Sequence, residues 1–282
     1  MSKTKYNYDI SFFFPAIRTP KWVALYESLK LSCKNYNWEL VFCGPFPLPE
    51  ELQNIDNVKC VKEDGCVSRA VQVGVLETTG KLIFIGNDDT LYREDAFDHA
   101  LDHYNEVAGP IDIMQATYVE GGNVQPNNYW STAFHAAFHV PGIDQTWKLA
   151  TEPIVPREYF MEMGGFDCRW EYMDGSTHDF AFRSQRNGSE IIYSPVIVGD
   201  MEWSPDHTGD HGPIHDAMCL HDNAIFQEMW SVPNDRLKID YDNYKEQPGV
   251  WSRRFPTEVY ESYEKLWDGE GYVAEYKAAP YR

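Results

Sequence analysis

Short apolar runs and amphipathic stretches alternate along the first part of the chain. Four runs are short and are closed by glycine, proline or a polar turn, which is typical of buried strands; they cover residues 9–15, 38–43, 58–61 and 81–86. The stretches between and after these runs space their apolar side chains at helical intervals, so we predict helices over residues 19–33, 68–78 and 94–107. Ser68 and Gly80 are the expected N-cap and C-cap of the second helix.

Strands that alternate with helices predict an α/β fold with a Rossmann-like, mixed and mostly parallel central sheet flanked by helices. In such sheets the ligand lies beyond the carboxyl ends of the strands. The strand over residues 81–86 leads directly into the polar turn Asn87-Asp88-Asp89, so we expect this turn at the ligand crevice. The pattern is less regular further on, where we expect an edge strand over 111–119, a strand over 190–193 and helices over 156–163, 178–186 and 222–230.

The composition narrows the classes of partner. The 282 residues include 24 Lys and Arg against 44 Asp and Glu, which gives a formal net charge of −20. A chain this acidic, without clustered basic residues, is a poor partner for nucleic acid or an anionic membrane surface. A small anionic substrate remains compatible if a divalent cation bridges it to the protein.

The chain also lacks the usual signals of export or membrane insertion. No apolar stretch reaches the ~18–20 residues that span a bilayer, and no targeting segment is visible. The six cysteines are scattered and form no CxxC pair. We therefore expect a cytoplasmic protein with reduced thiols and no membrane span.

The polar turn at residues 87–89 is a candidate metal site. Carboxylates at the end of a strand can hold Mg²⁺ or Mn²⁺ and leave coordination positions for diphosphate oxygens. Asn and Asp also tolerate left-handed turn geometry and cap helices, so a purely structural turn is the alternative. On these three residues alone, the two interpretations are about equally supported.

The residues before the turn favour a functional site. Ser68-Arg69-Ala70 through Gly74, then Thr79-Gly80-Lys81, a strand and the acidic turn follow one another in an order that resembles the donor half of inverting family 2 glycosyltransferases, which have the GT-A fold. The resemblance implies that Asp89 is the metal ligand. It also implies that Asp88 and Asn87, which replaces the first acid of the family's triplet, contact the sugar-nucleotide donor.

The same resemblance assigns further donor contacts. Residues 14–18, Phe-Pro-Ala-Ile-Arg, match the opening segment whose backbone cradles the nucleotide in the family. At the end of the second strand the family often has an Asp for the base, whereas this chain has Cys43-Gly44-Pro45. Residues near the third strand are then the expected substitute contacts to the base or ribose. The donor contacts implied in this way are Pro15, Ala16, Arg18, Asp64 and Arg69.

A second block resembles the part of the family that carries the catalytic base. Gly164-Gly165-Phe166-Asp167 is followed by His178-Asp179 at the start of a predicted helix. An inverting transfer needs a carboxylate that takes the proton of the acceptor hydroxyl, and the resemblance gives this role to Asp179. His178 stands where the family commonly has Glu, and Gly164 and Gly165 are expected to border the acceptor pocket. Without the resemblance, Asp179 would be interpreted as a residue that stabilises a helix N-terminus.

Two later segments add candidates. Four histidines and four aspartates crowd residues 206–222. Many GT-A enzymes complete their metal site with a histidine from a late loop, so the resemblance implies His207 or His211 as a further metal ligand, and imidazole suits Mn²⁺. Trp130, in the loop 123–147, either stacks on an acceptor sugar or covers the sheet.

Taken together, the resemblance and the patterns that carry it imply a glycosyltransferase of the hexosyltransferase type. It would move a sugar from a nucleoside-diphosphate sugar, with UDP as the expected nucleotide, to a carbohydrate or other hydroxyl acceptor, with inversion and with Mn²⁺ or Mg²⁺. We expect a GT-A domain over residues 1–230, with a donor half at 8–110 and an acceptor half at 111–230, and a C-terminal extension over 231–282 packed on it. Two alternatives stay open: a metal-dependent hydrolase built on the His/Asp cluster of residues 206–222, and an inactive nucleotide-sugar-binding protein.

Overall fold

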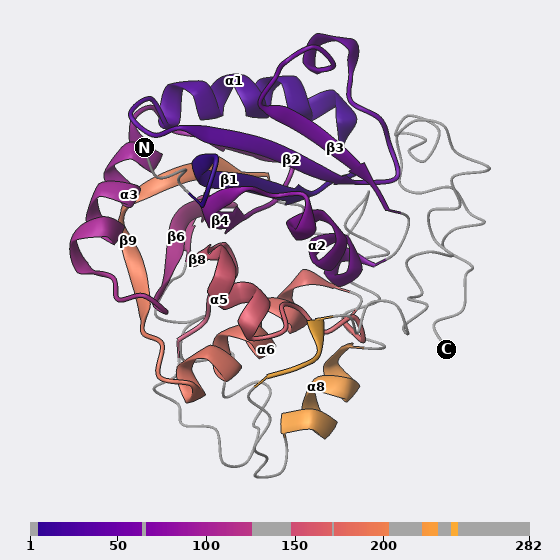
Figure 1. Cartoon of the computed structure of the whole chain (residues 1–282), viewed down its shortest axis with the longest axis vertical. Coiled ribbons are helices and arrows are strands. Elements are labelled where there is room, and N and C mark those ends of the chain that lie inside the picture. The colour runs from indigo at the N-terminus through magenta and orange to yellow at the C-terminus, as the bar shows by residue number, and fades with distance from the viewer. Residues whose placement is uncertain are drawn as a thin grey trace.

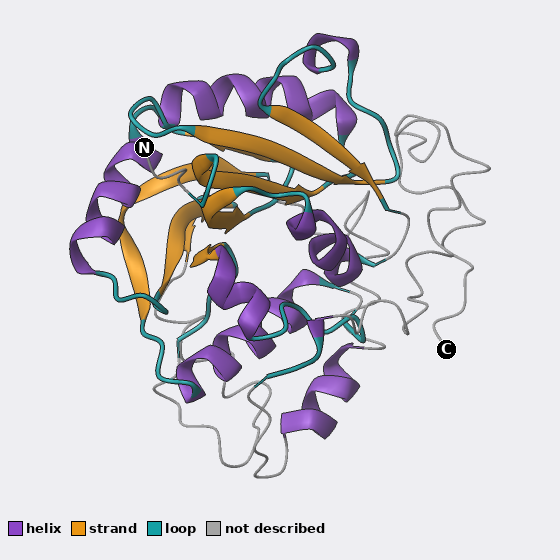
Figure 2. Cartoon of the chain, in the orientation of Figure 1, coloured by secondary structure: helices purple, strands orange, loops and turns teal. Residues whose placement is uncertain are grey.

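The computed structural model describes residues 5–63, 66–125, 148–170, 172–202, 222–230 and 238–241. Their core is a nine-stranded mixed sheet with the order β3-β2-β1-β4-β8-β6-β9-β5, to which β7 adds by pairing with β6 (Figures 1 and 2). The strands are β1 (Tyr8–Pro15), β2 (Trp38–Gly44), β3 (Val58–Lys62), β4 (Gly80–Ile85), β5 (Thr90–Tyr92), β6 (Ile113–Glu120), β7 (Asn123–Gln125), β8 (Pro153–Pro156) and β9 (Ile191–Met201). The α-helices are α1 (Trp22–Ser32), α2 (Val67–Leu76), α3 (Ala96–Val107), α5 (Arg157–Glu162), α6 (Met173–Arg186) and α8 (Asn223–Trp230), and the short 3-10 helices are η1 (Thr19–Lys21) and η2 (Glu50–Leu52).

The strands β3, β2, β1 and β4 run parallel, so their carboxyl ends meet at one edge. Successive residues of a strand point to opposite faces, and helices cover both faces here. Phe12 and Phe14 pack into the apolar cluster that includes α1 and α3, whereas Phe13 packs into the cluster that includes α2, α5 and α6. Double coverage explains why these strands are continuous apolar runs in the sequence.

An antiparallel strand joins this parallel half to the rest of the sheet. β8 pairs with β4 through Phe84 and Ile154, and with β6 through Gln115 and Pro153. This register carries Glu152, the residue before β8, to the end of β4, where the backbone amide of Ala116 donates to its carbonyl oxygen at 3.0 Å. β8 therefore brings an acidic residue from the second half of the chain to the polar turn after β4.

The predicted mixed α/β architecture is confirmed, but several boundaries differ. Gly80 does not cap α2; it begins β4, where a side chain would collide with Ser11 of β1. Cys66, and not Ser68, is the N-cap of α2, and the buried hydroxyl of Ser68 contacts that of Ser176. The strand expected at an edge is β6, which lies inside the sheet between β8 and β9. The helix expected over 178–186 is α6, which begins at Met173.

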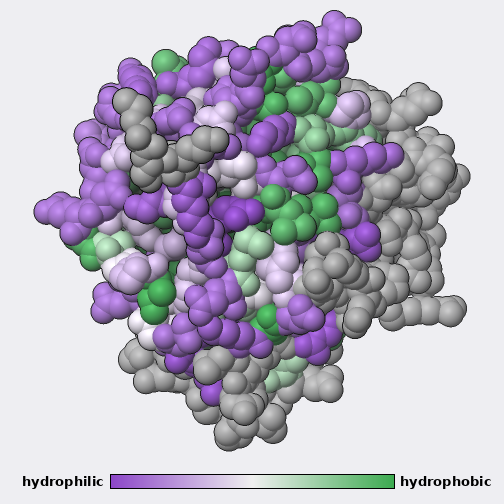
Figure 3. All heavy atoms as spheres, in the orientation of Figure 1, coloured by the Kyte–Doolittle hydropathy of each residue, from purple (hydrophilic) through white to green (hydrophobic). Residues whose placement is uncertain are grey.

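The described surface is mostly hydrophilic in the view of Figure 3, with smaller apolar areas among the polar side chains. None of the helices in the described ranges is both long and apolar enough to cross a membrane.

Candidate active site

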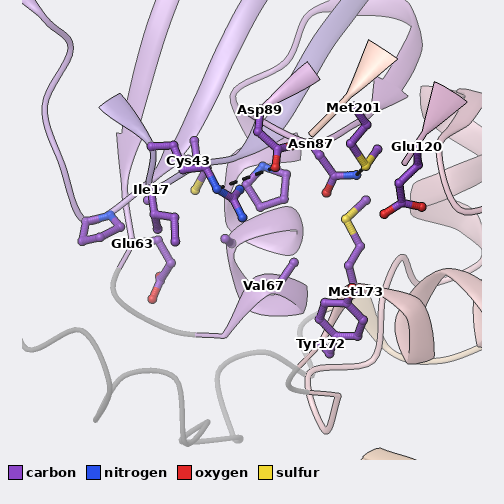
Figure 4. Close-up of a pocket in the computed structure, with 16 residues that line it drawn as sticks. Ile17, Cys43, Glu63, Val67, Asn87, Asp89, Glu120, Tyr172, Met173 and Met201 are labelled. Carbon is purple, nitrogen blue, oxygen red and sulfur yellow. Dashed lines mark hydrogen bonds and ion pairs between the residues drawn. The ribbon is translucent and has the colours of Figure 1, made fainter. Parts of the chain in front are cut away.

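A pocket opens at the carboxyl edge of the parallel strands (Figure 4). Ile17, Cys43 and Glu63 lie on one side of it, Glu120 and Met201 lie on the other, and Asn87 and Asp89 lie between them. It thus occupies the position that the parallel topology predicts for a ligand. The lining residues are Pro15, Ala16, Ile17, Arg18, Cys43, Gly44, Pro45, Glu63, Val67, Ala70, Asn87, Asp89, Glu120, Tyr172, Met173 and Met201.

The middle residue of the polar turn, Asp88, faces away from the pocket lining and is fully buried. Its Oδ2 accepts hydrogen bonds from the backbone amides of Ile17 and Arg18, both at 2.7 Å, and from Trp22 Nε1 at 2.9 Å. Its Oδ1 accepts from Arg18 Nη1 at 2.6 Å. Asp88 was predicted as a donor contact; in this structure its carboxylate instead shapes the segment after β1, which lines the pocket.

The flanking residues Asn87 and Asp89 line the pocket. Asp89 Oδ2 lies 3.7 Å from Arg18 Nε. The Asn87 amide nitrogen is directed toward Met201, whose Sδ is 3.8 Å away, and its oxygen points into the pocket (Figure 4). Both side chains therefore offer oxygen atoms to a bound group.

A buried carboxyl supports this turn from behind. Glu152 is 0% exposed, and its Oε1 accepts a hydrogen bond from Asn87 Nδ2 at 3.2 Å. Burial raises the pKa of Glu152 to about 8; the nearby carboxylates of Asp89 and Glu120 act in the same direction, and the side-chain and backbone hydrogen bonds from Asn87 act against them.

The ends of β1, β2 and β3 form one wall of the pocket, which is the side where the sequence predicted the donor contacts. Gly44 lies so close to the carbonyl of Ala16 that a side chain there would collide with it. Glu63 lines the pocket and forms an ion pair with Arg69, with 2.8 Å between Oε1 and Nε. Arg69 is therefore held at the edge of the predicted donor side, whereas Asp64 lies outside the described residues.

One carboxylate lines the opposite side, and a second carboxyl follows the lining residues at the start of α6. Glu120, at the end of β6, lines the pocket together with Tyr172 and Met173 at the start of α6. Asp174 follows in the first turn of α6, and burial, together with the charges of Glu120 and Asp222, raises its pKa to about 7. A carboxyl with a pKa near neutrality beside a pocket is suited to exchange a proton there.

Asp179, the residue expected to be the base, lies elsewhere. Its carboxylate has no exposed surface, accepts from Arg183 Nε at 2.9 Å and accepts from Trp230 Nε1 at 3.1 Å. Arg183 also donates to the carbonyl oxygens of Met163 at 2.7 Å and Gly165 at 2.6 Å. A base must reach the acceptor hydroxyl, and the enclosure of this carboxylate argues against that role for Asp179.

The remaining acceptor-side candidates that the structure describes do not line the pocket. His178 is completely buried in α6, and neither it nor the Gly-Gly turn lines the pocket. Gly164 and Gly165 have φ angles of +87° and +64°, which favour glycine, and Gln72 bridges the turn by donating to the Gly164 carbonyl and accepting from the Phe166 amide. The candidates Trp130, His207 and His211 lie outside the described residues.

The acidic side chains at the pocket outnumber the basic ones. Asp89, Glu63 and Glu120 line it, with Arg18 as the one basic lining residue that the structure describes. Within the described ranges, no three His, Cys, Asp or Glu side chains gather around one point as a ready-made metal site. Asp89 and Asn87 supply hard oxygen atoms that suit Mg²⁺ or Mn²⁺, and such ions commonly keep positions for substrate phosphates.

Sequence patterns found the strand-end residues but not their partners. No sequence motif contains the acidic residues Glu120, Glu152 and Asp174. Pairing between β6 and β8 brings the first two toward the pocket, and the start of α6 at Met173 brings the third there. The one available signal was their chemistry: an isolated acidic residue next to an apolar segment is a candidate for a perturbed pKa.

Comparisons with known proteins support the fold. No family model matches the chain, and no curated protein sequence matches it. Among solved structures, the S. aureus TarS fragment in complex with UDP is similar, with a TM-score of 0.53 and 14% identity over 80% of this chain and 67% of that one. The complex of the same fragment with UDP-GlcNAc gives 0.53 and 14% over 80% and 68%. A longer TarS structure gives 0.51 and 13%, and this chain covers 41% of it. TarS is a glycosyltransferase, and the likeness shows that this chain has a GT-A-like fold.

Proposed function

We propose that this protein is a glycosyltransferase that binds a nucleoside-diphosphate sugar, with UDP as the expected nucleotide, in the pocket at the ends of β1, β2 and β4. The observation that carries the proposal is the strand-end turn in which Asn87 and Asp89 face the pocket while Asp88 anchors the segment after β1. The similarity to structures of TarS bound to UDP and UDP-GlcNAc supports the class of ligand.

The charges around the pocket favour a cation-bridged donor. A diphosphate would meet the carboxylate of Asp89 and the amide oxygen of Asn87, and Arg18 is already engaged by Asp88 and Asp89. Mn²⁺ or Mg²⁺ bound at Asp89 and Asn87 would offset the charge of the departing diphosphate. Further ligands from residues 203–221, among them His207 or His211, remain part of the proposal.

We place the general base at Asp174 in place of Asp179. In an inverting transfer, the acceptor oxygen bonds to the anomeric carbon on the face opposite the diphosphate, the bond from that carbon to the phosphate oxygen breaks, and the hydroxyl proton passes to the base. Asp174 lies beside pocket residues Tyr172 and Met173, and its pKa of about 7 suits this step. Glu120 raises that pKa and would border the acceptor.

A thermal-shift screen tests the proposal. UDP, GDP, CDP and ADP are added at saturating concentration with Mn²⁺, with Mg²⁺ or with EDTA. We expect one nucleotide to raise the melting temperature only when the cation is present, because a ligand that binds the folded state at 100 times its Kd stabilises it by about 2.7 kcal/mol. The proposal fails if no nucleotide stabilises the protein with either metal.

Two other outcomes would point to other functions. Stabilisation by UDP without turnover of any donor sugar would indicate a nucleotide-sugar-binding protein. Release of phosphate from a simple ester without any acceptor would indicate a metal-dependent hydrolase based on residues 206–222.

A further inference from the structure

The contact between Glu152 and Asn87 is fixed from both sides. The carboxyl of Glu152 is completely buried and accepts from Asn87 Nδ2, and the Asn87 backbone amide hydrogen-bonds to the same carboxyl. The Glu152 backbone is held as well, because its amide donates to Gln115 Oε1 at 3.0 Å and its carbonyl accepts from Ala116. Glu152 is therefore a rigid acceptor at the end of β4.

This acceptor decides which end of the Asn87 amide faces the pocket. An amide group has an oxygen acceptor at one end and an NH₂ donor at the other. The neighbours on the protein side, Glu152 Oε1 and Met201 Sδ, are both acceptors, so the NH₂ group turns toward them. The oxygen is left to point into the pocket (Figure 4).

The orientation matters because the two possible surfaces bind different groups. A pocket-facing NH₂ group would donate directly to a phosphate oxygen, whereas a pocket-facing oxygen repels phosphate and attracts a cation. With the carboxylate of Asp89 also in the lining, the Asn87 oxygen adds a second side-chain acceptor at the end of β4. A diphosphate would then need a divalent ion between itself and this surface.

We propose that Glu152 is a positioning residue that makes nucleotide binding depend on a divalent cation, because it holds Asn87 with its oxygen, and not its NH₂ group, toward the pocket. This inference rests on the proposed function and adds a residue from a distant part of the chain to it. Glu152 acts through the acceptor atom Oε1, so its negative charge is not what the role requires.

Two variants separate orientation from ionisation. Glu152→Gln keeps an oxygen that accepts the same hydrogen bond but cannot ionise, and Glu152→Met keeps the approximate volume but removes both the acceptor and the ionisable group. UDP affinity is measured by calorimetry with Mn²⁺ and with EDTA, and the ratio of the two affinities is the readout. Glu158→Met, an exposed glutamate on α5, is the matched control.

In Glu152→Met, the Asn87 amide is free to turn its NH₂ group to the phosphate. We therefore expect the ratio of the UDP affinity with Mn²⁺ to that with EDTA to fall about tenfold, which corresponds to about one hydrogen bond. The ratio should stay within about threefold of wild type in Glu152→Gln and in the control. A global loss of stability would weaken both affinities together and leave the ratio unchanged.

A second readout does not depend on nucleotide binding. The protein is labelled with ¹⁵N at asparagine, and the side-chain signal of Asn87 is identified by its absence in Asn87→Asp. Its NH₂ protons should exchange slowly with solvent in wild type and in Glu152→Gln, and at least about tenfold faster in Glu152→Met, which corresponds to the loss of one hydrogen bond.

The possible failures are distinguishable. If wild type binds no UDP under either condition, the proposed function fails, and the inference about cation dependence fails with it. If wild type binds UDP with Mn²⁺ but Glu152→Met keeps the wild-type ratio or exchange rate, the inference alone is overturned. If Glu152→Gln behaves like Glu152→Met, the ionisable carboxyl and not the orientation of Asn87 is responsible, and the inference is again overturned.

Discussion

The three residues of the strand-end turn, Asn87-Asp88-Asp89, differ in what their side chains contact. Asn87 and Asp89 line the pocket, whereas Asp88 is fully buried and points into the protein. The functional and the structural interpretations of this turn, which the sequence left equally supported, therefore apply to different residues of it.

The buried carboxylate of Asp88 should be a strong determinant of stability. In Asp88→Asn, one oxygen could keep the hydrogen bonds of Ile17, Arg18 and Trp22, but the new NH₂ group would then face Arg18 Nη1, which now lies 2.6 Å from Oδ1. We expect a loss of about 3 kcal/mol in the free energy of unfolding, measured with urea, since one partner of a buried ion pair is removed. Asp89→Asn is the control and should lose less; equal losses would contradict this division of roles.

Asp174 should be needed for turnover. Asp174→Asn cannot take the acceptor proton, so we expect donor turnover to fall about 10²- to 10⁴-fold, while UDP binding with Mn²⁺ stays close to wild type. In the wild type, the rate should rise with pH and reach half its maximum near pH 7, where the carboxyl loses its proton. Unchanged turnover in Asp174→Asn would remove this residue from the mechanism.

The same substitution should stabilise the protein at higher pH. The folded pKa of Asp174 is about 7, above its ordinary value of 3.8. Between these values the unfolded state loses the proton first, so the contribution of Asp174 to stability falls as pH rises through this window. Urea denaturation at pH 4 and pH 8 should show Asp174→Asn gaining stability relative to wild type as pH increases. A constant difference would contradict the raised pKa.

At the scale of elements, α6 carries carboxylates on two different sides. Asp174 and Asp179 are five residues apart, which places them roughly 140° apart around a helix of 3.6 residues per turn. Asp174 is near the pocket, whereas Asp179 and Arg183 tie α6 to the Gly164-Gly165 turn. One carboxylate of the helix is thus the candidate base, and the other fixes the helix to the rest of the protein.

Asp179 should therefore matter for folding and not for chemistry. In Asp179→Asn, Arg183 loses its buried counter-charge, and we expect the free energy of unfolding to fall by about 3–5 kcal/mol. Donor turnover per folded molecule, measured at a temperature where the variant is folded, should remain within a few-fold of wild type. A large loss of turnover without loss of stability would restore Asp179 as the base.

The sequence predicted the elements whose burial is uniform and missed those that depend on distant pairing. The strands β1, β2 and β4 could be predicted because helices cover both of their faces, which makes each strand a continuous apolar run in the sequence. β8 is four residues long and exists through its ladders with β4 and β6, which leave no periodic signal. The start of α6 was missed because Gly175, Ser176 and Thr177 are weak helix formers, and Gly175 is there to pack against Trp170.

The candidate site was predictable to the same extent. Pro15, Ala16, Arg18, Asn87 and Asp89 were implied by the family resemblance, and all of them line the pocket at the edge where the parallel strands end. Glu152 and Asp174 could not be found, because the register of β8 and the rotation of α6 decide where they point. Asp179 was implied by the resemblance and by its position after the Gly-Gly-Phe-Asp turn, and neither reports which face of a helix is buried.

At the scale of the whole molecule, the negative charge of the protein and the position of the pocket favour a ligand that is bound together with a cation. The formal net charge is −20, and the pocket adds Asp89, Glu63 and Glu120 to the place where a diphosphate would bind. A molecule with this charge distribution repels a free anion. It would bind a nucleotide sugar only as a complex with a divalent cation, at the edge where the parallel strands end.

Calorimetric titration of UDP in the presence of Mn²⁺ tests this central claim most directly. The titration compares wild type with Asp89→Asn, and with Asp102→Asn on the outer surface of α3 as a control for the loss of one charge. We expect one saturable site in wild type and in Asp102→Asn, and an affinity at least about tenfold lower in Asp89→Asn, as for the loss of a charge-assisted contact. The absence of binding in wild type, or equal affinity in Asp89→Asn, would contradict the account.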